Sequence, residues 1–228
     1  MFGAEHLDDP GEALALALGY PYAIPTSSYG LVGGVVADIE AVEGDLAGRA
    51  PLLAYGSNAA PEVLARKLAA APDPVPVVRT DLHDFDVVYS AHVSPYGAVP
   101  ATLRRSPGTE VRAFIAYLTS EQLGLVSATE PNYELVKLDS PSCVLTQGDV
   151  PAELSAYVSR HGCLLLDGHE IALAEIRARH RRFVAMGQRE VLQRVRDLLD
   201  PGRDLASFVE ASAAGAISAA RLDRGEAP

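Results

Sequence analysis

The chain has 228 residues, 48% of them apolar, and a formal charge of −11 at pH 7. This length and apolar fraction allow a well-buried core in one large domain or two small ones. The excess of negative charge is unfavourable for binding phosphate backbones, so we exclude nucleic acid as a partner.

The N-terminal twenty residues contain a short apolar run that follows acidic residues. A secretory signal has basic residues at that place, and the run is too short to cross a bilayer. We therefore expect a cytoplasmic protein without a membrane partner. The sequence does not indicate an oligomeric state.

Composition divides the chain into three segments. Residues 1–50 form an acidic arm, with eight acidic residues and one arginine. Residues 51–145 are rich in strand signals, and residues 146–228 read as a hairpin followed by helices that pack on the strand-rich domain.

Five strand signals in the middle segment are rich in β-branched or aromatic residues. They lie at 52–55, 85–90, 99–105, 111–118 and 133–138. Turn residues at 94–97 and 106–108 separate some of them, and Thr119-x-x-Gln122 predicts a short helix that ends near Ser127. This spacing predicts an α+β fold, in which a mixed or antiparallel sheet curls into a small barrel with flanking helices.

A basic stretch at residues 177–196 has seven arginines and one glutamate. A basic helix can bind an anionic partner or a membrane surface. The apolar stripe within the stretch instead favours a helix docked on a core. We interpret the arginines as solvated or paired within the chain, the acidic arm being one candidate partner.

Residues Leu52–Leu68, LLAYGSNAAPEVLARKL, predict a strand, a tight turn and a helix. Gly56 lets the chain turn, Ser57 and Asn58 favour turns or caps, and Pro61 suits the first turn of a helix. Such a turn, with the helix N-terminus behind it, directs N–H groups into the space above the strand end, where they can hold a carboxylate or a developing oxyanion. The alternative is that Gly-Ser-Asn only reverses the chain.

A second candidate site is Thr129-Glu130-Pro131-Asn132-Tyr133. Proline favours an extended backbone at Glu130, which lies between a short helix and a strand. Aromatic and apolar neighbours suit a partly desolvated carboxylate that acts as a general acid or base. The alternative is a solvated loop glutamate.

Four stretches occur in a recognisable order: LLAYGSNAAPEVLARKL, LHDFDVVYS, GAVPATLRRSPGTEVRAFIAYL and SATEPNY. Over residues 50–140 they resemble the gamma-glutamylcyclotransferase family of the YGSN type. The resemblance implies a small mixed β-barrel that releases 5-oxoproline from γ-glutamyl amines or γ-glutamyl amino acids, without metal or cofactor. It implies that Glu130 is the catalytic acid/base and that Tyr133 lines the substrate pocket. The residues that match the substrate-cradling turn are Tyr55, Gly56, Ser57 and Asn58.

The chain departs from the family pattern ahead of Glu130, where Leu125–Thr129 replaces the usual Leu-Asp run. Glu134 is a rival carboxylate, although the strand period directs it to the face opposite Tyr133. A non-catalytic binding module of the same fold, which holds a carboxylate ligand at the turn, is the alternative function. The identity of the leaving amine stays open. The substrate could be a free γ-glutamyl amino acid, a γ-glutamyl-protected biosynthetic intermediate or a γ-glutamyl-amine lysine adduct.

A third interpretation makes Ser57 or Cys143 a nucleophile with a histidine as base. The candidate histidines are His83, His92, His161 and His169. Ser57 lacks the Gly-x-Ser-x-Gly elbow, and no histidine has a spacing tied to either nucleophile, so we give this interpretation little weight.

Metal binding by His161, Cys163 and His169 is also unfavoured, because their spacing matches no zinc pattern. Asp167-Gly168 between two apolar runs predicts a β-hairpin instead. Both cysteines of the chain are expected to be buried thiols without a disulfide.

Overall fold

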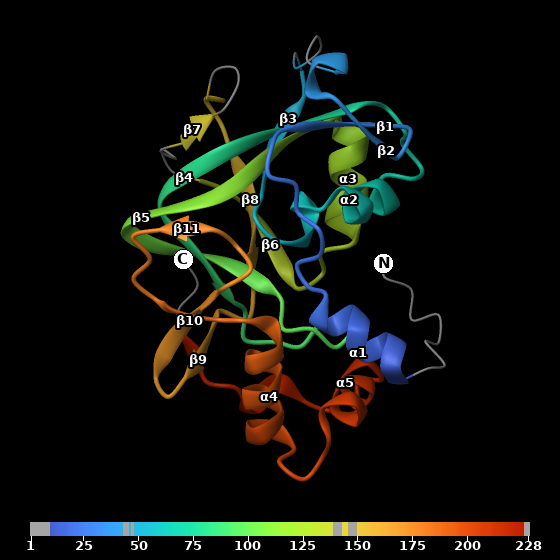
Figure 1. The fold of residues 1–228 in the computed structure, drawn as a ribbon. Coiled ribbons are helices and arrows are strands. Elements are labelled where there is room, and N and C mark those ends of the chain that lie inside the picture. Colours follow the sequence, from blue (N-terminus) through green and yellow to red (C-terminus); the bar gives the residue numbers. More distant parts are fainter. Residues whose placement is uncertain (1–9, 43–45, 47, 139–142, 146–149, 226–228) are drawn as a thin grey trace.

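The computed structural model describes residues 10–42, 46, 48–138, 143–145 and 150–225. A curled sheet runs through this part of the chain, and helices gather at two places along it (Figure 1). Helices α2 and α3 lie beside β1 and β2, whereas α1, α4 and α5 lie together at the opposite end. The mixed α+β class predicted from the sequence is confirmed.

Two long antiparallel strands, β4 (Val75–Tyr89) and β5 (Ala101–Leu118), form the centre of the sheet. On one side, β5 pairs with β3 (Ala50–Ala54), and β8 (Ser155–Ser159) and β6 (Tyr133–Lys137) follow. On the other side, β4 is followed by β10 (His169–Leu173), β9 (Cys163–Leu166) and β13 (Arg224–Gly225). Strands from all three sequence segments therefore share one sheet.

Five short strands attach to this path. They are β1 (Tyr29–Val32) on β4, β2 (Val35–Ala37) on β1, β7 (Cys143–Leu145) on β4, β11 (Ala178–Arg179) on β5 and β12 (Val184–Met186) on β10. The strand β1 belongs to the acidic arm, so part of the arm is built into the sheet.

The sheet is not a closed barrel, and the sequence prediction was wrong on this point. Its path ends at β13 and β6, and no strand pairing joins these two among the described residues. The two halves attach at different levels of the central pair: β3 lies along Phe114–Leu118 of β5, whereas β10 contacts β4 at Val88. Because the two edges are displaced along the central strands, they do not meet.

The turn predicted at residues 106–108 was also wrong, because β5 continues through it as one strand. Gly108 has a φ of 83° and Asp84 on the opposite strand has a φ of 63°. The N–H of Gly108 donates to the Asp84 carboxylate at 2.8 Å, where the β4–β5 register shifts. Residues that favour turns therefore produce a bulge that bends both strands together.

The helices are short, and among the described residues none is long and apolar enough to cross a membrane. They are α1 (Pro10–Leu18), α2 (Pro61–Lys67), α3 (Ser120–Ala128), α4 (Gln188–Leu199) and α5 (Leu205–Ala213). The predicted capping box is confirmed: the Thr119 hydroxyl accepts from the Gln122 N–H, and the Gln122 side chain accepts from the Thr119 N–H.

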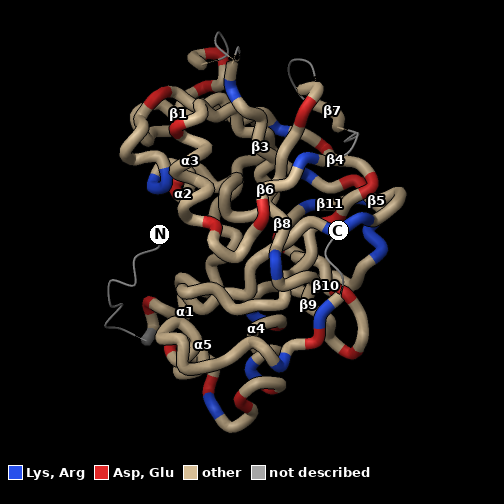
Figure 2. The backbone as a smooth tube through the Cα atoms, turned by 180° about the vertical axis from the view of Figure 1, so that it is seen from behind, with Lys and Arg blue, Asp and Glu red and all other residues tan. Residues whose placement is uncertain are grey.

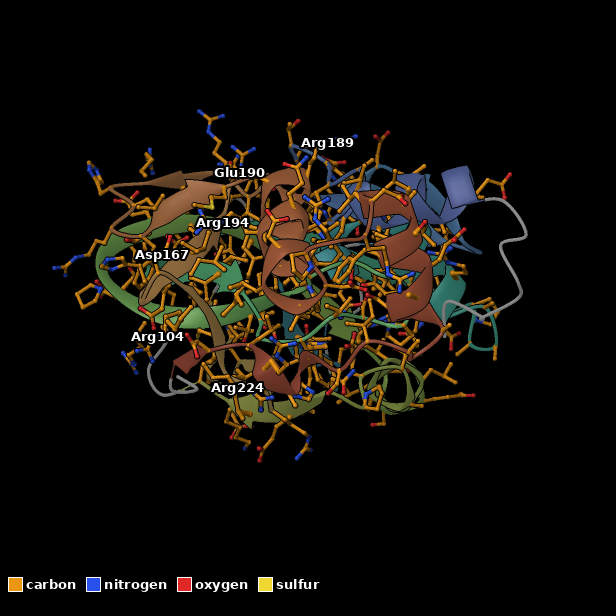
Figure 3. The ribbon with its side chains drawn as sticks, turned by 90° about the horizontal axis from the view of Figure 1, so that it is seen from below. Arg104, Asp167, Arg189, Glu190, Arg194 and Arg224 are labelled. Carbon is orange, nitrogen blue, oxygen red and sulfur yellow. The ribbon has the colours of Figure 1, made fainter. Side chains whose placement is uncertain are left out.

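The arginine-rich stretch is not one helix, because β11 and β12 precede α4. Most of its predicted apolar stripe packs on the core, with Val191, Leu192 and Val195 fully buried, but Leu198 is exposed. Four of the seven arginines, Arg179, Arg181, Arg194 and Arg196, pair with carboxylates, and Figure 3 shows Arg194 of α4 beside Asp167 of the β9–β10 turn. In the described part of the chain, their carboxylate partners lie outside the acidic arm: Asp81, Asp86, Glu110, Asp167 and Asp197.

The predicted turn at residues 94–97 is confirmed, and it fixes where α5 docks. The N–H of Gly97 donates to the Ser94 carbonyl at 2.9 Å, and Gly97 has a φ of 81°. A Cβ atom at this residue would lie 2.5 Å from Cγ1 of Val209 on α5. Only glycine fits both the backbone conformation and the space.

We expect Gly97→Ala to lower the free energy of unfolding by about 3 kcal/mol, because backbone strain adds to the clash with α5. Gly108→Ala is the matched control, since its φ is also positive but no atom lies within 4 Å of the added Cβ. Urea unfolding of both variants measures the difference. Equal losses would show that contact with Val209 does not constrain Gly97.

Candidate functional site

A cavity of about 260 Å³ lies at the end of β3. Its walls come from the arm, the strand–turn–helix unit after β3, the 94–96 turn, the start of β5 and the segment from α3 to β6. The six residues singled out from the sequence all line it: Tyr55, Gly56, Ser57, Asn58, Glu130 and Tyr133. The fold thus brings two segments more than seventy residues apart into one site.

The strand–turn–helix unit forms as the sequence predicts, with a 3₁₀ turn at Ser57–Ala59 between β3 and α2. The N–H groups of Ala59 and Ala60 close this turn on the carbonyls of Gly56 and Ser57. No hydrogen bond between described residues uses the N–H of Ser57 or Asn58. The N–H groups of Ser57 and Asn58, both of which line the cavity, are therefore available to a ligand.

Glu130 lines the same cavity as this turn and contacts it directly. Its Oε1 accepts from Asn58 Nδ2 at 2.9 Å and from Lys67 Nζ at 2.6 Å. The Glu130 side chain is 13% exposed and the Lys67 side chain 12%. The Glu130 N–H donates to the Ser127 carbonyl at the end of α3, which holds the backbone in place.

The rival carboxylate Glu134 is exposed on β6 and does not line the cavity. Successive side chains of a strand point to opposite faces, so Tyr133 enters the cavity while Glu134 faces away. Among the described lining residues, Glu130 is the only acidic one.

Lys67 is the main polar residue that the sequence did not reveal. It is the last residue of α2, where a basic side chain is commonly explained by the helix dipole. In the fold it forms an ion pair with Glu130 instead. Two donors thus converge on Oε1, and no hydrogen bond between described residues uses Oε2.

Five tyrosines give the cavity an aromatic wall. They are Tyr20, Tyr55, Tyr96, Tyr133 and Tyr157. The Ala101 N–H donates to the Tyr20 hydroxyl at 2.8 Å, and the Tyr133 hydroxyl donates to the Ala101 carbonyl at 2.9 Å. The Tyr55 hydroxyl donates to the Tyr157 carbonyl. Because the hydroxyls of Tyr20, Tyr133 and Tyr55 bond the backbone, these three rings are held in place.

The tyrosines remain neutral phenols at physiological pH. Burial raises the pKa of Tyr133 well above its usual value of 10.0, and nearby tyrosines and Glu130 raise it further. Burial also raises the pKa of Tyr20, which belongs to the N-terminal arm. The arm therefore contributes a wall of the site, which its acidic composition did not indicate.

The nucleophile interpretation finds no support in the geometry. No histidine lines the cavity in the described part of the chain, and Cys143 lies on β7, outside it. His92 is hydrogen-bonded to Ser90 at 2.6 Å, and burial followed by the charges of His161 and Arg224 lowers its pKa to about 3. Within the described ranges, no group of three or more His, Cys, Asp or Glu residues is arranged to hold a metal ion.

Comparison with known proteins gives two partial structural likenesses. No family model matches the chain, and no curated protein matches it. An allophanate hydrolase from Kluyveromyces lactis is similar over 49% of this chain and 17% of its own length, with 11% identity and a TM-score of 0.36. A gamma-glutamyl cyclotransferase is similar over 49% of this chain and 66% of its own length, with 19% identity and a TM-score of 0.34. The chain thus spans less than two thirds of either protein.

Proposed function

We propose that the protein is a γ-glutamylcyclotransferase, which releases 5-oxoproline from a γ-glutamyl amine or a γ-glutamyl amino acid. The observation that carries the proposal is a 2.9 Å hydrogen bond inside one aromatic cavity. It joins Glu130 to Asn58 of the turn at Tyr55–Asn58, the YGSN turn. It brings a donor-rich turn and a carboxylate together in the wall of a cavity that fits a small molecule.

The reaction is an attack by the α-amino nitrogen on the γ-carbonyl carbon of the same molecule. A new C–N bond closes the five-membered ring, and the bond to the leaving amine breaks. A cavity whose aromatic walls are held by hydrogen bonds favours the folded conformation of the substrate, which brings the reacting atoms together before the bond forms.

One proton must move from the attacking amine to the leaving amine. The α-amine is mostly protonated at neutral pH, so it first loses one proton to solvent, and the free amine then needs a carboxylate base for the second proton, which it loses as the ring closes. Asn58 and Lys67 both hold Oε1 of Glu130, which leaves Oε2 to take the proton and to deliver it to the leaving nitrogen. Glu130 thus serves as base and then as acid.

Negative charge develops on the γ-oxygen as the amine attacks. The N–H groups of Ser57 and Asn58 are preset donors for such an oxyanion or for the substrate α-carboxylate. Lys67 and Arg66 also line the cavity and make it favourable for an anionic substrate.

A binding module is the second candidate, and the 2.6 Å ion pair between Lys67 and Glu130 favours it. A carboxylate held by a cation can serve only to shape the cavity, with the ligand bound at the YGSN turn and no proton transferred. The two functions share a site and differ in turnover.

A panel of γ-glutamyl amines and γ-glutamyl dipeptides separates the two candidates. We expect 5-oxoproline from at least one member, detected by chromatography after incubation with the full chain. Binding measured by calorimetry with no 5-oxoproline from any member would identify the binding module. Neither binding nor turnover would contradict both.

Replacing Lys67 with methionine is expected to lower kcat/KM for 5-oxoproline release by about 10- to 100-fold, the size of one lost hydrogen bond to a charged group. The Glu130 carboxylate would lose one of the two donors that orient it. Arg66→Met is the matched control, because it removes the same charge from the neighbouring position on the cavity wall. Equal losses of kcat/KM in the two variants would instead show that the effect comes from the total positive charge of the cavity wall.

A further inference from the structure

A second cavity, of about 200 Å³, shares Ala54 and Tyr55 with the candidate active site. Its apolar lining includes Ile24, Phe114 and Ile176. Its charged lining includes two arginines, Arg112 of β5 and Arg177 immediately before β11, together with Glu175.

The two arginines are cross-strand neighbours. Ala178 pairs with Val111 in the antiparallel β5–β11 ladder, so Arg177 lies opposite Arg112, and the Arg112 N–H donates to the Arg177 carbonyl at 2.9 Å. Arg79 of β4 pairs with Phe114, two residues along from Arg112, and is therefore its diagonal neighbour on the same face. Figure 2 shows basic stretches gathered where β4, β5 and β11 run side by side. Like charges placed in this way destabilise a sheet.

Carboxylates on this face do not neutralise the arginines of the cavity. Asp81 lies opposite Arg112 in the β4–β5 register, but its carboxylate is 3.4 Å from Arg79 and 3.9 Å from Arg179. Glu110 pairs with Arg179 at 2.6 Å. The two acidic residues nearest in the sheet are thus held by other arginines.

Arg112 and Arg177 have no ion pair within 4.0 Å among the described residues. The Nε of Arg112 is buried without an acceptor in the same part of the chain. Glu175 also lines the cavity, but its Oε1 accepts from the Gln188 N–H at the start of α4, at 2.8 Å. Partial burial and then the charges of Arg79 and Arg177 lower the pKa of Arg112, whereas the charge of Asp81 acts in the opposite direction. Arg112 and Arg177 differ from the exposed arginine Arg182 in that they line one cavity side by side.

We propose that this second cavity binds a small organic anion, whose carboxylate or phosphate group lies between Arg112 and Arg177. The planar guanidinium groups match the geometry of an oxyanion, which accepts several hydrogen bonds at once. The apolar part of the ligand contacts Ile24, Phe114 and Ile176. The bound anion offsets the repulsion between the cross-strand arginines.

Thermal unfolding of the full chain tests the proposal, with inorganic phosphate and benzoate as separate probes in chloride buffer at constant ionic strength. A ligand that binds only the folded state raises Tm, and we expect a rise of about 3 °C at ten times the Kd. A rise with phosphate alone identifies a phosphate ester as the natural class of ligand, and a rise with benzoate identifies a carboxylate.

The variants R112Q and R177Q are expected to remove the rise, whereas R182Q keeps it. Arg182 is an exposed arginine outside the cavity, so R182Q removes the same charge without changing the site. Arg177 is exposed, so its substitution leaves the core unchanged. If R112Q does not fold, R177Q alone tests the proposal. The proposal is overturned by the lack of a rise with either probe, by a rise that persists in R177Q, or by an equal loss in R182Q.

Discussion

Replacing Glu130 with glutamine is expected to lower kcat/KM for 5-oxoproline release by about 10²- to 10⁴-fold, the range for loss of a general acid or base. Glutamine keeps the size of the side chain and an oxygen that accepts from Asn58 and Lys67, but it does not exchange a proton. The thermal unfolding midpoint should change little. Steady-state kinetics and a thermal scan of the same preparation measure both effects.

Glu134→Gln is the matched control for this experiment. Glu134 lies four residues further along the chain, exposed on β6 and outside the cavity. We expect its activity to equal that of the wild type. Full activity in Glu130→Gln, or a loss of the same size in both variants, would show that residue 130 does not transfer the proton.

Replacing Arg181 with methionine is expected to lower the free energy of unfolding by about 3–5 kcal/mol, the usual cost of leaving a buried charge without its partner. Arg181 donates to both carboxylate oxygens of Asp86, which is fully buried on β4. It also donates to the carbonyls of Leu173 and Ile176, and so ties the end of β10 to the central strand. Urea unfolding at pH 7 measures the loss.

The loss in Arg181→Met should shrink as the pH falls. Burial raises the pKa of Asp86, and Arg181 opposes this rise. Without the arginine, the folded state binds a proton on Asp86 more tightly than the unfolded state does, so stability falls as pH rises through the folded pKa and returns at acid pH. Arg194→Met, which breaks an exposed pair with Asp167, should give a much smaller loss with no such recovery. Equal losses of unfolding free energy in the two variants would show that leaving the buried Asp86 without its arginine costs no more than leaving the exposed Asp167 without its arginine.

Elements specified by short-range signals were predictable from the sequence. The capping box at Thr119, the Asp167-Gly168 hairpin turn and the strand–turn–helix unit around Gly56 each depend on a few adjacent residues. Such signals act before tertiary contacts form, so the fold preserves them.

Features that depend on distant residues were not predictable in the same way. Residues 106–108 have the composition of a turn, and they form a bulge instead because Gly108 bonds Asp84 on the neighbouring strand. Asp84 is distant in the sequence, so the local pattern does not reveal this contact. Barrel closure depends on where the outer strands attach along β4 and β5, which no local pattern encodes. Composition alone did not indicate that Lys67 and Tyr20 would reach the candidate site, because both do so through tertiary packing.

The central claim is that Glu130 and the YGSN turn act on one small molecule. A crystal structure of the full chain with 5-oxoproline bound tests it most directly. We predict that the ring nitrogen lies within hydrogen-bond distance of the Glu130 carboxylate, and that an oxygen of the product accepts from the N–H groups of Ser57 and Asn58. A product bound elsewhere, or one that contacts the turn with its nitrogen away from Glu130, would contradict the claim.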